Sequence, residues 1–149
     1  MTPDQFTEFL RREIPLVAAM DARVLRIDEG EIEIGAPLAP NSNLHGTAFA
    51  GSLAALGLIC GWCAVHRAIS AAGLTAQLVA QNSECAFVAP ATQALRGVAT
   101  ISADDAAQMV NALQRKGRAR LQVMTQIHAD ATLVATHRGT YVAKLTSHS

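Results

Sequence analysis

The residues best placed to do chemistry lie in a polar loop that runs into a long apolar segment. Residues 41–47 read Asn-Ser-Asn-Leu-His-Gly-Thr, and no Asp, Glu, Lys or Arg occurs from Gly35 to His66. A helix that starts in such a loop offers unpaired backbone amides and the positive end of its dipole, which stabilise a developing oxyanion. We therefore expect a catalytic cluster here, flanked by two ligand-binding residues. The expected catalytic residues are Asn43, His45, Gly46 and Thr47, and the flanking residues are Asn41 and Ser52.

The members of this cluster have distinct expected roles. The amides of Gly46, Thr47 or Ala48 donate to a carbonyl oxygen as its carbon becomes tetrahedral, and Gly46 lets a ligand approach the backbone closely. His45 orients a water molecule or acts as a base. The alternative interpretation is ordinary helix capping by Asn43 or Thr47 beside an exposed histidine.

A second group of reactive side chains is Cys60, Cys63 and His66, which recur every three residues. In redox sites of the Cys-x-x-Cys kind the pair stands at a helix amino end, where the dipole lowers the thiol pKa. Here the pair falls well inside a predicted helix, and three ligands are one short of a structural zinc site. We expect inert buried thiols and no bound metal.

A third group is basic and occupies six consecutive positions. Arg115, Lys116, Arg118 and Arg120 are four of the twelve Lys and Arg residues of the chain. Such a concentration suits the phosphate groups of a ligand, so we expect these four residues to bind substrate. The alternative is a solvated helix end and strand start, with cations placed favourably near a helix carboxyl end.

Composition limits the class of protein. The 149 residues predict one domain over positions 1–149, and the 50% hydrophobic content predicts a true core. Twelve basic residues balance twelve acidic ones and aromatic residues make up only 4%, so we expect no nucleic-acid partner. Three cysteines without a signal sequence predict a cytoplasmic location. Residues 48–65 are uncharged and approach the length of a membrane span, but they are mostly Ala and Gly, so we expect no span.

Hydrophobic periodicity predicts the elements that position these groups. Thr2 and Gln5 form a capping box for a first helix that Pro15 interrupts or ends. A helix from about Thr47 to Ser70 is apolar around nearly its whole circumference, so other elements must enclose it. The rest of the chain predicts an α+β fold, a curved antiparallel sheet rolled around this helix. Its expected strands are 24–28, 32–36, 76–88, 94–102, 118–129 and 132–145. A short amphipathic helix is expected between the strands 94–102 and 118–129.

Three stretches of the chain resemble a known family. The run from Asn41 to Leu53, Asn-Ser-Asn-Leu-His-Gly-Thr-Ala-Phe-Ala-Gly-Ser-Leu, is similar to the loop and helix start of the YiiD C-terminal-type putative thioesterases. Phe87-Val-Ala-Pro90 and Arg115-Lys-Gly-Arg118 are similar to the end of the third strand and the phosphate-side strand of the hotdog superfamily. The resemblance runs from the first helix to about Leu145 and implies a hotdog fold.

The resemblance also implies a homodimer or a dimer of dimers, and a catalytic carboxylate. Phenylacetyl-CoA-type hotdog thioesterases place an aspartate on the central helix, where this sequence has Ala54. Because the resemblance implies that the strands over residues 76–88 pair across the dimer, Glu84 is the nearest carboxylate to the partner's helix start. We therefore expect Glu84 to be the base if it is buried, and Asn82 and Ser83 to bind substrate, the alternative being a solvated Glu84.

Together these features predict hydrolysis of an acyl thioester, either acyl-CoA or an acyl carrier protein, by water at the amino end of the central helix. Asn43 and His45 then position the water or the leaving sulfur. No cofactor is expected beyond the coenzyme A portion of the substrate. The alternatives are a non-catalytic acyl-CoA-binding or scaffold protein of the same fold and a hotdog dehydratase or hydratase.

Overall fold

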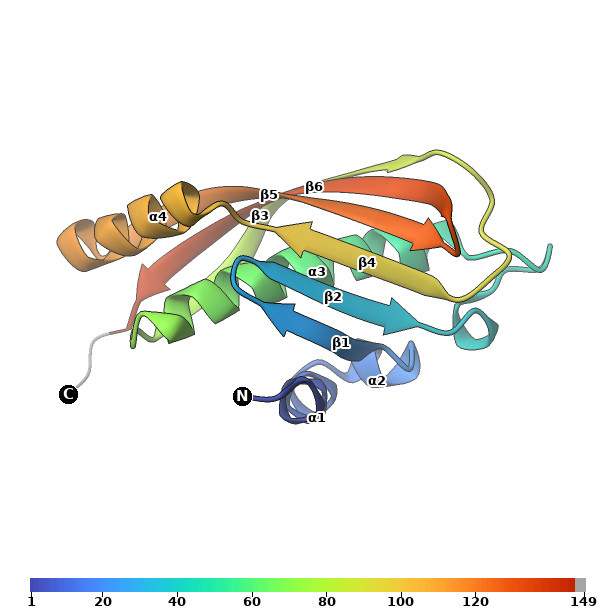
Figure 1. The fold of residues 1–149 in the computed structure, drawn as a ribbon, viewed down its shortest axis with the longest axis horizontal. Coiled ribbons are helices and arrows are strands. Elements are labelled where there is room, and N and C mark those ends of the chain that lie inside the picture. The colour runs from blue at the N-terminus through green and yellow to red at the C-terminus, as the bar shows by residue number, and fades with distance from the viewer. Residues whose placement is uncertain (147–149) are drawn as a thin grey trace.

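One long helix, α3 (Ala50–Ala71), lies against the concave side of a six-stranded antiparallel sheet in the computed structural model, which describes residues 1–146 (Figure 1). The strands are β1 (Arg23–Asp28), β2 (Glu31–Ala36), β3 (Ala76–Phe87), β4 (Leu95–Thr100), β5 (Arg118–Ala129) and β6 (Thr132–Leu145). Their order across the sheet is β1-β2-β4-β5-β6-β3. The predicted α+β class and hotdog architecture are confirmed.

The smaller helices also follow their sequence signals. Both hydrogen bonds of the capping box between Thr2 and Gln5 are present at the start of α1 (Pro3–Glu13), and Pro15 begins a separate α2 (Pro15–Ala19). Ser102 caps α4 (Ala103–Lys116) by accepting from the amide of Asp105. All six strands agree with their predicted bounds to within two residues at each end.

The central helix begins later than predicted, at Ala50 rather than Thr47. Ser42 and Ala48 form an isolated antiparallel bridge, and the amide of Asn43 donates to the carbonyl of Thr47 at 2.8 Å. Residues 42–48 therefore fold back on themselves as a small loop, and the chain turns into the helix only after Phe49.

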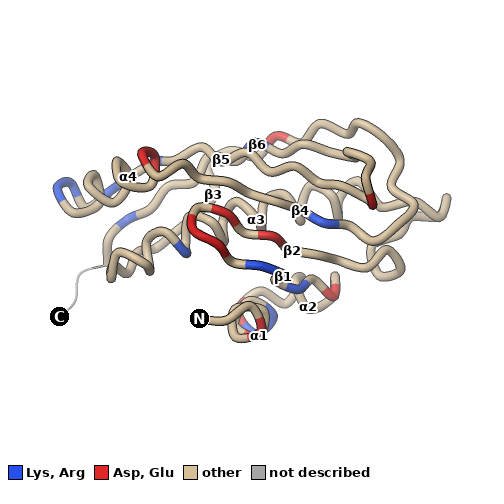
Figure 2. Tube along the Cα trace, in the orientation of Figure 1, with Lys and Arg blue, Asp and Glu red and all other residues tan. Residues whose placement is uncertain are grey.

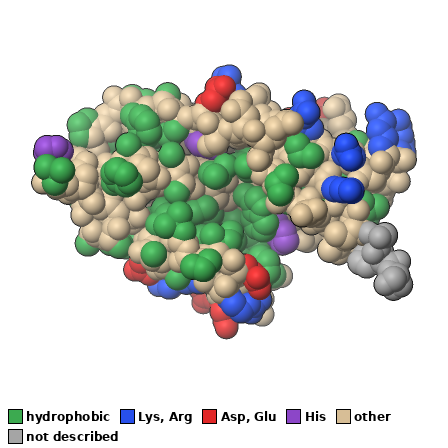
Figure 3. All heavy atoms as spheres, turned by 180° about the vertical axis from the view of Figure 1, so that it is seen from behind, with side chains coloured by type: hydrophobic (Ala, Val, Ile, Leu, Met, Phe, Trp, Pro, Cys, Tyr) green, Lys and Arg blue, Asp and Glu red, His purple; other side chains and the backbone are tan. Residues whose placement is uncertain are grey.

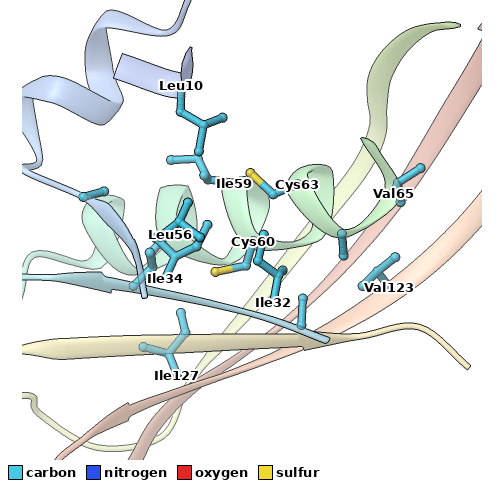
Figure 4. Close-up of a cluster of buried hydrophobic side chains, with 14 of the residues drawn as sticks. Leu10, Ile32, Ile34, Leu56, Ile59, Cys60, Cys63, Val65, Val123 and Ile127 are labelled. Carbon is cyan, nitrogen blue, oxygen red and sulfur yellow. The ribbon is translucent and has the colours of Figure 1, made fainter. Parts of the chain in front are cut away.

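The concave side of the sheet and α3 share one hydrophobic core. Leu56 and Cys60 on α3 lie beside Ile34 and Ile32 of β2, and Ile127 of β5 lies below them (Figure 4). Glycines on the helix let the sheet come close, since a Cβ on Gly57 would be 2.4 Å from Cβ of His137 on β6. Within residues 1–146, α3 is the one helix long and apolar enough to cross a membrane, but it is the buried core helix of the domain.

Strand β3 forms one edge of the sheet. It pairs with β6 along one side, and its other side has no strand partner within the described chain. Most of its twelve residues are exposed. A long, mostly uncharged edge of this kind is a template for pairing with another strand.

Candidate active site

Asn43 organises the polar loop between the bridge residues. Its Oδ1 accepts from the amides of His45 at 2.8 Å and Thr47 at 3.2 Å, and its Nδ2 donates to Oγ1 of Thr47 at 2.8 Å. Gly46 has a φ of 77°, which glycine adopts without strain. The exposed side chain of His45 therefore lies at the tip of a loop whose shape Asn43 fixes.

The three amides predicted as oxyanion donors in this loop all have hydrogen-bond acceptors within the chain. The amide of Gly46 donates to Asn43 O at 3.3 Å, that of Thr47 to the Asn43 side chain, and that of Ala48 to Ala91 O at 2.9 Å. The reason is the late start of α3, which leaves these three amides in the folded loop rather than at the helix end.

Asn41, which the sequence predicted to bind a ligand, is buried and hydrogen-bonded to the backbone of two other segments. It is 1% exposed, and its Nδ2 donates to the carbonyls of Met20 at 2.9 Å and Pro37 at 2.8 Å. Its own carbonyl accepts from the amide of Phe49 at 2.7 Å. Asn41 thereby ties the chain before α3 to α2 and to the end of β2.

The free donors lie at the amino end of α3 itself. Phe49 is the N-cap residue and makes no side-chain cap. The amides of Ala50 and Gly51 donate to no group within residues 1–146, whereas the amides of Ser52 and Leu53 both donate to the carbonyl of Phe49. Two unpaired N–H groups and the positive end of a 22-residue helix therefore meet at this point, with the half-buried Ser52 on the same turn.

An apolar groove of about 340 Å³ runs beside this helix end. Leu53 lines it from α3, and the far wall is the segment that follows β3. That wall consists of Phe87, Val88, Ala89, Pro90 and Ala91. Phe87 and Val88 are more than half exposed, and Figure 3 shows hydrophobic side chains gathered over the middle of this face of the molecule. A groove of this size and lining suits the acyl part of a small ligand.

The two faces of β3 carry different groups. Ser83 lies opposite Gly139 and Cys85 opposite His137, so their side chains share the side that faces α3. Glu84 lies opposite Arg138 on the outer side, with Oε2 3.9 Å from Nη1 of that arginine and the side chain 60% exposed. The single chain thus shows the solvated alternative for Glu84. Asn82 lies in the middle of β3, and its Oδ1 accepts from the amide of Ser83 at 2.9 Å.

The structure also brings together two side chains that are 54 residues apart. Oγ of Ser83 lies 2.7 Å from Nε2 of His137, and His137 is completely buried. Burial lowers the pKa of this imidazole below its ordinary value, which keeps it neutral at pH 7. Sequence reasoning selected Ser83 but missed His137, because their contact depends on the pairing of β3 with β6.

Comparison with known proteins identifies the family. A family model with the description Putative thioesterase (yiiD_Cterm) matches residues 3–145. The chain belongs to this family. Three solved structures resemble it over almost their whole length, and those under one quarter identical support the fold alone.

A putative thioesterase from Shewanella oneidensis is 27% identical, with a TM-score of 0.87 over 95% of this chain and 96% of that one. A protein from Chlorobaculum tepidum is 23% identical, with a TM-score of 0.91 over 97% and 98%. A Pseudomonas aeruginosa protein called a probable thioesterase is 20% identical, with a TM-score of 0.82 over 97% of each chain.

In this member of the thioesterase family the predicted basic residues cluster at the far end of α3. Arg115 and Lys116 end α4, while Arg118 and Arg120 start β5, and Lys144 lies directly opposite Arg118 (Figure 2). Within residues 1–146 none of the five lies within 4 Å of a carboxylate. We call these five residues the basic corner. In one chain it stands at the opposite end of the molecule from the groove (Figures 1 and 2).

A second cavity, of about 470 Å³, lies beside the carboxyl half of α3. Its lining includes Asp28, Glu29, Glu31 and Arg67. Arg26 pairs with Asp28 and Glu31, and Glu29 shares the wall with Arg67, so this cavity offers phosphate groups no excess of positive charge.

Cys60 and Cys63 are completely buried, and burial raises the pKa of both thiols. Their protonated state suits core packing rather than redox or metal chemistry. Across residues 1–146 no group of three or more potential metal ligands occurs.

Proposed function

We propose that this protein hydrolyses an acyl thioester whose carbonyl oxygen binds at the amino end of α3, with water as the final acyl acceptor. The observation that carries the proposal is the pair of unpaired amides on Ala50 and Gly51 beside an apolar groove. Two such donors stabilise the oxyanion that forms when the thioester carbonyl becomes tetrahedral. The family and the Shewanella relative support the same reaction class.

The substrate in this proposal is a phosphopantetheine thioester, either acyl-CoA or an acyl carrier protein. The acyl group lies in the groove against Leu53 and Phe87, and the basic corner binds phosphate. No further cofactor is needed, because the thioester bond is itself an activated acyl donor.

We further propose that the active form is a dimer in which two β3 strands pair antiparallel through their free edges. A twofold axis reverses the direction of the partner, so the amino end of each α3 lies nearer the carboxyl half of the other. This arrangement brings the partner's basic corner toward the groove, which a single chain does not achieve. It also covers the apolar side chains around β3, among them Val79 and Phe87, which are 52% and 55% exposed in the single chain.

In the same proposal the polar loop, whose residues Thr47 and Ala48 line the groove, contributes to the active site. Asn43 holds the loop in shape, and His45 at its tip orients a water molecule or the leaving sulfur.

The test is release of free thiol from a panel of acyl-CoA thioesters of increasing chain length. We expect turnover with at least one chain length, and inhibition by the matching non-hydrolysable thioether. Saturable binding of that thioether without any thiol release would overturn the hydrolase and support an acyl-binding protein, the alternative favoured by the absence of Asp and Glu from α3.

A further inference from the structure

The hydrogen bond between Ser83 and His137 places a hydroxyl that solvent can reach on top of a histidine that it cannot. Ser83 belongs to the exposed edge strand β3, and His137 belongs to β6 with no exposed surface. Nε2 of the imidazole lies 2.7 Å from Oγ of Ser83. Any proton that the imidazole exchanges through Nε2 therefore passes through the serine hydroxyl.

The imidazole is held firmly in place. A Cβ on Gly57 would be 2.4 Å from Cβ of His137, so the ring is wedged against the backbone of α3. Thr125 of β5 lies directly opposite His137 and is also completely buried. A base fixed by packing keeps its orientation toward the serine without further hydrogen bonds.

The second ring nitrogen carries the independent observation. Nδ1 of His137 is buried and has no hydrogen-bond partner within residues 1–146. A buried polar atom without a partner destabilises the fold and calls for a functional reason. A histidine kept solely for packing would be served better by an apolar side chain of similar size.

We propose that Ser83 is the nucleophile that takes the acyl group from the thioester, with His137 as its general base. The inference rests on the proposed thioester hydrolysis and adds a covalent intermediate to it. Nucleophile and base within hydrogen-bond distance, with the base fixed by its surroundings, form the arrangement that activates serine elsewhere.

The reaction has two balanced steps. In the first, Oγ of Ser83 bonds to the carbonyl carbon as its proton moves to Nε2 of His137, the C–S bond breaks, and the thiolate leaves with the electron pair and takes that proton. In the second, rotation of the acylated side chain uncovers Nε2, water gives it a proton and bonds to the carbonyl carbon, and the C–Oγ bond breaks. The proton on Nε2 then returns to Oγ, which releases a carboxylic acid and restores the pair.

Among the described residues no carboxylate pairs with Nδ1, which fits a thioester rather than an amide as the substrate. A thiol has an ordinary pKa of about 8.5, so the sulfur leaves as a thiolate and needs no strong acid to protonate it before the C–S bond breaks. Expulsion of an amine requires a strong acid at the same place, which a carboxylate on the far nitrogen supports.

The oxyanion donors that serve Ser83 come from the partner subunit in this proposal. Gly57, against which His137 packs, is seven residues beyond Ala50 and hence about 10 Å along the helix. One carbonyl group does not span that distance within a single chain. The antiparallel dimer instead turns the amino end of the partner's α3 toward the middle of β3.

The experiment combines a covalent probe with thioester turnover. Wild type, Ser83→Ala and a matched control, Ala86→Ser, are treated with a fluorophosphonate, which phosphonylates an activated serine irreversibly, and the modified peptide is identified by mass spectrometry. Ala86→Ser adds a hydroxyl to the outer face of the same strand. Ser83 is exposed, so Ser83→Ala leaves no cavity in the core, although it removes the hydrogen-bond partner of Nε2 on His137.

We expect labelling at Ser83 in wild type and in the control, and none in Ser83→Ala together with a loss of about a hundredfold in thiol release. Thioester turnover without labelling of Ser83, or with Ser83→Ala at the wild-type rate, would overturn the nucleophile and leave the hydrolase standing. Labelling of Ser83 in a protein that cleaves no thioester would show that Ser83 is an activated nucleophile and would overturn the proposed thioester substrate instead.

Discussion

The hydroxyl of Tyr141 lies so close to Gly61 that a Cβ on the glycine would be 2.1 Å from the oxygen. The same hydroxyl donates to the carbonyl of Leu58 at 2.9 Å, so the tyrosine cannot move away without losing this bond. We expect Gly61→Ala to lower the free energy of unfolding by about 1–3 kcal/mol. Alanine is otherwise the better helix former by about 1 kcal/mol. A urea titration measures the change, and a higher free energy of unfolding in Gly61→Ala would show that the close contact with Tyr141 does not constrain this position.

Ala50→Pro tests the oxyanion site without disturbing the helix. Ala50 is the first residue of α3, a position that proline favours, and Phe49 before it is extended with φ −66° and ψ 133°. Proline therefore removes one N–H donor and no intrahelical bond. We expect kcat for thioester hydrolysis to fall by about a hundredfold or more.

The matched control for that variant is Ala103→Pro at the start of α4. Ala103 is likewise the first helical residue, and Ser102 before it has φ −66° and ψ 154°. We expect wild-type kcat and wild-type helicity by circular dichroism. Equal rates in Ala50→Pro and Ala103→Pro would show that the amide of Ala50 does not bind the oxyanion.

Dimer formation through β3 can be tested with two adjacent lysine substitutions. Cys85 faces α3 and Ala86 faces outward, so Cys85→Lys brings two like charges to the helix-facing side of the paired edges and Ala86→Lys does not. We expect light scattering to give twice 15.7 kDa, or a multiple of it, for wild type and Ala86→Lys, and 15.7 kDa for Cys85→Lys. A wild-type monomer would remove the dimer from the proposal.

The elements were predictable because their hydrophobic periods are strong and their caps local, as at Thr2 and Ser102. The residue at which α3 starts was not predictable in this way. Asn43 uses its side chain to fold residues 42–48 into a loop, and a bridge between Ser42 and Ala48 depends on tertiary contacts rather than on helix propensity.

The register of β3 explains why Glu84 is solvated in the single chain. A bulge between Ala80 and Asn82 adds one residue to the strand, which turns Glu84 to the outer side and Ser83 to the side of α3. One residue of slip exchanges the two faces of a strand, and a single sequence does not reveal it. The signal for His137 was present, since a polar residue at an inward position of an alternating strand indicates a buried polar contact.

The basic corner gives a prediction about the substrate. Arg118 and Lys144 lie directly opposite one another with no acidic partner within 4 Å in the described part of the chain, an arrangement that repulsion disfavours unless an anion binds. We expect Arg118→Gln to raise KM for an acyl-CoA by about tenfold at low salt, with kcat unchanged. A truncated acyl-pantetheine without phosphates serves as the control substrate, and its KM should not change.

Arg12→Gln controls for the loss of any one positive charge. Arg12 lies on α1, where it pairs with Glu13, and α1 is separate from α4, which carries part of the basic corner (Figure 2). A KM increase of the same size in Arg12→Gln and Arg118→Gln would show that KM depends on the net charge of the protein and not on phosphate binding at the basic corner.

The stability of the fold should depend on pH through the buried imidazole of His137 and the half-buried imidazole of His66. His66 stacks on Trp62 with ring centroids 4.9 Å apart and on Phe9 at 5.6 Å, and burial lowers the pKa of both His66 and His137. The unfolded chain takes up protons on these groups at a higher pH than the folded one does. Stability is therefore full above the unfolded pKa of about 6.5 and is lost as the pH falls below it.

The variant that isolates one of these groups is His66→Phe, which keeps an aromatic ring in the stack between Trp62 and Phe9 but cannot take up a proton. We expect the free energy of unfolding of wild type to fall between about pH 7.5 and about pH 5.5, well above the ordinary pKa values of carboxylates, and that of His66→Phe to fall less. The remaining slope belongs to His137, whose neighbours on the concave side, Ser83 and Thr125, carry no charge. Urea titrations at one fixed protein concentration measure both slopes, since association would otherwise shift the stability. Equal slopes in the two proteins would show that the imidazole of His66 takes up its proton as readily in the folded chain as in the unfolded one.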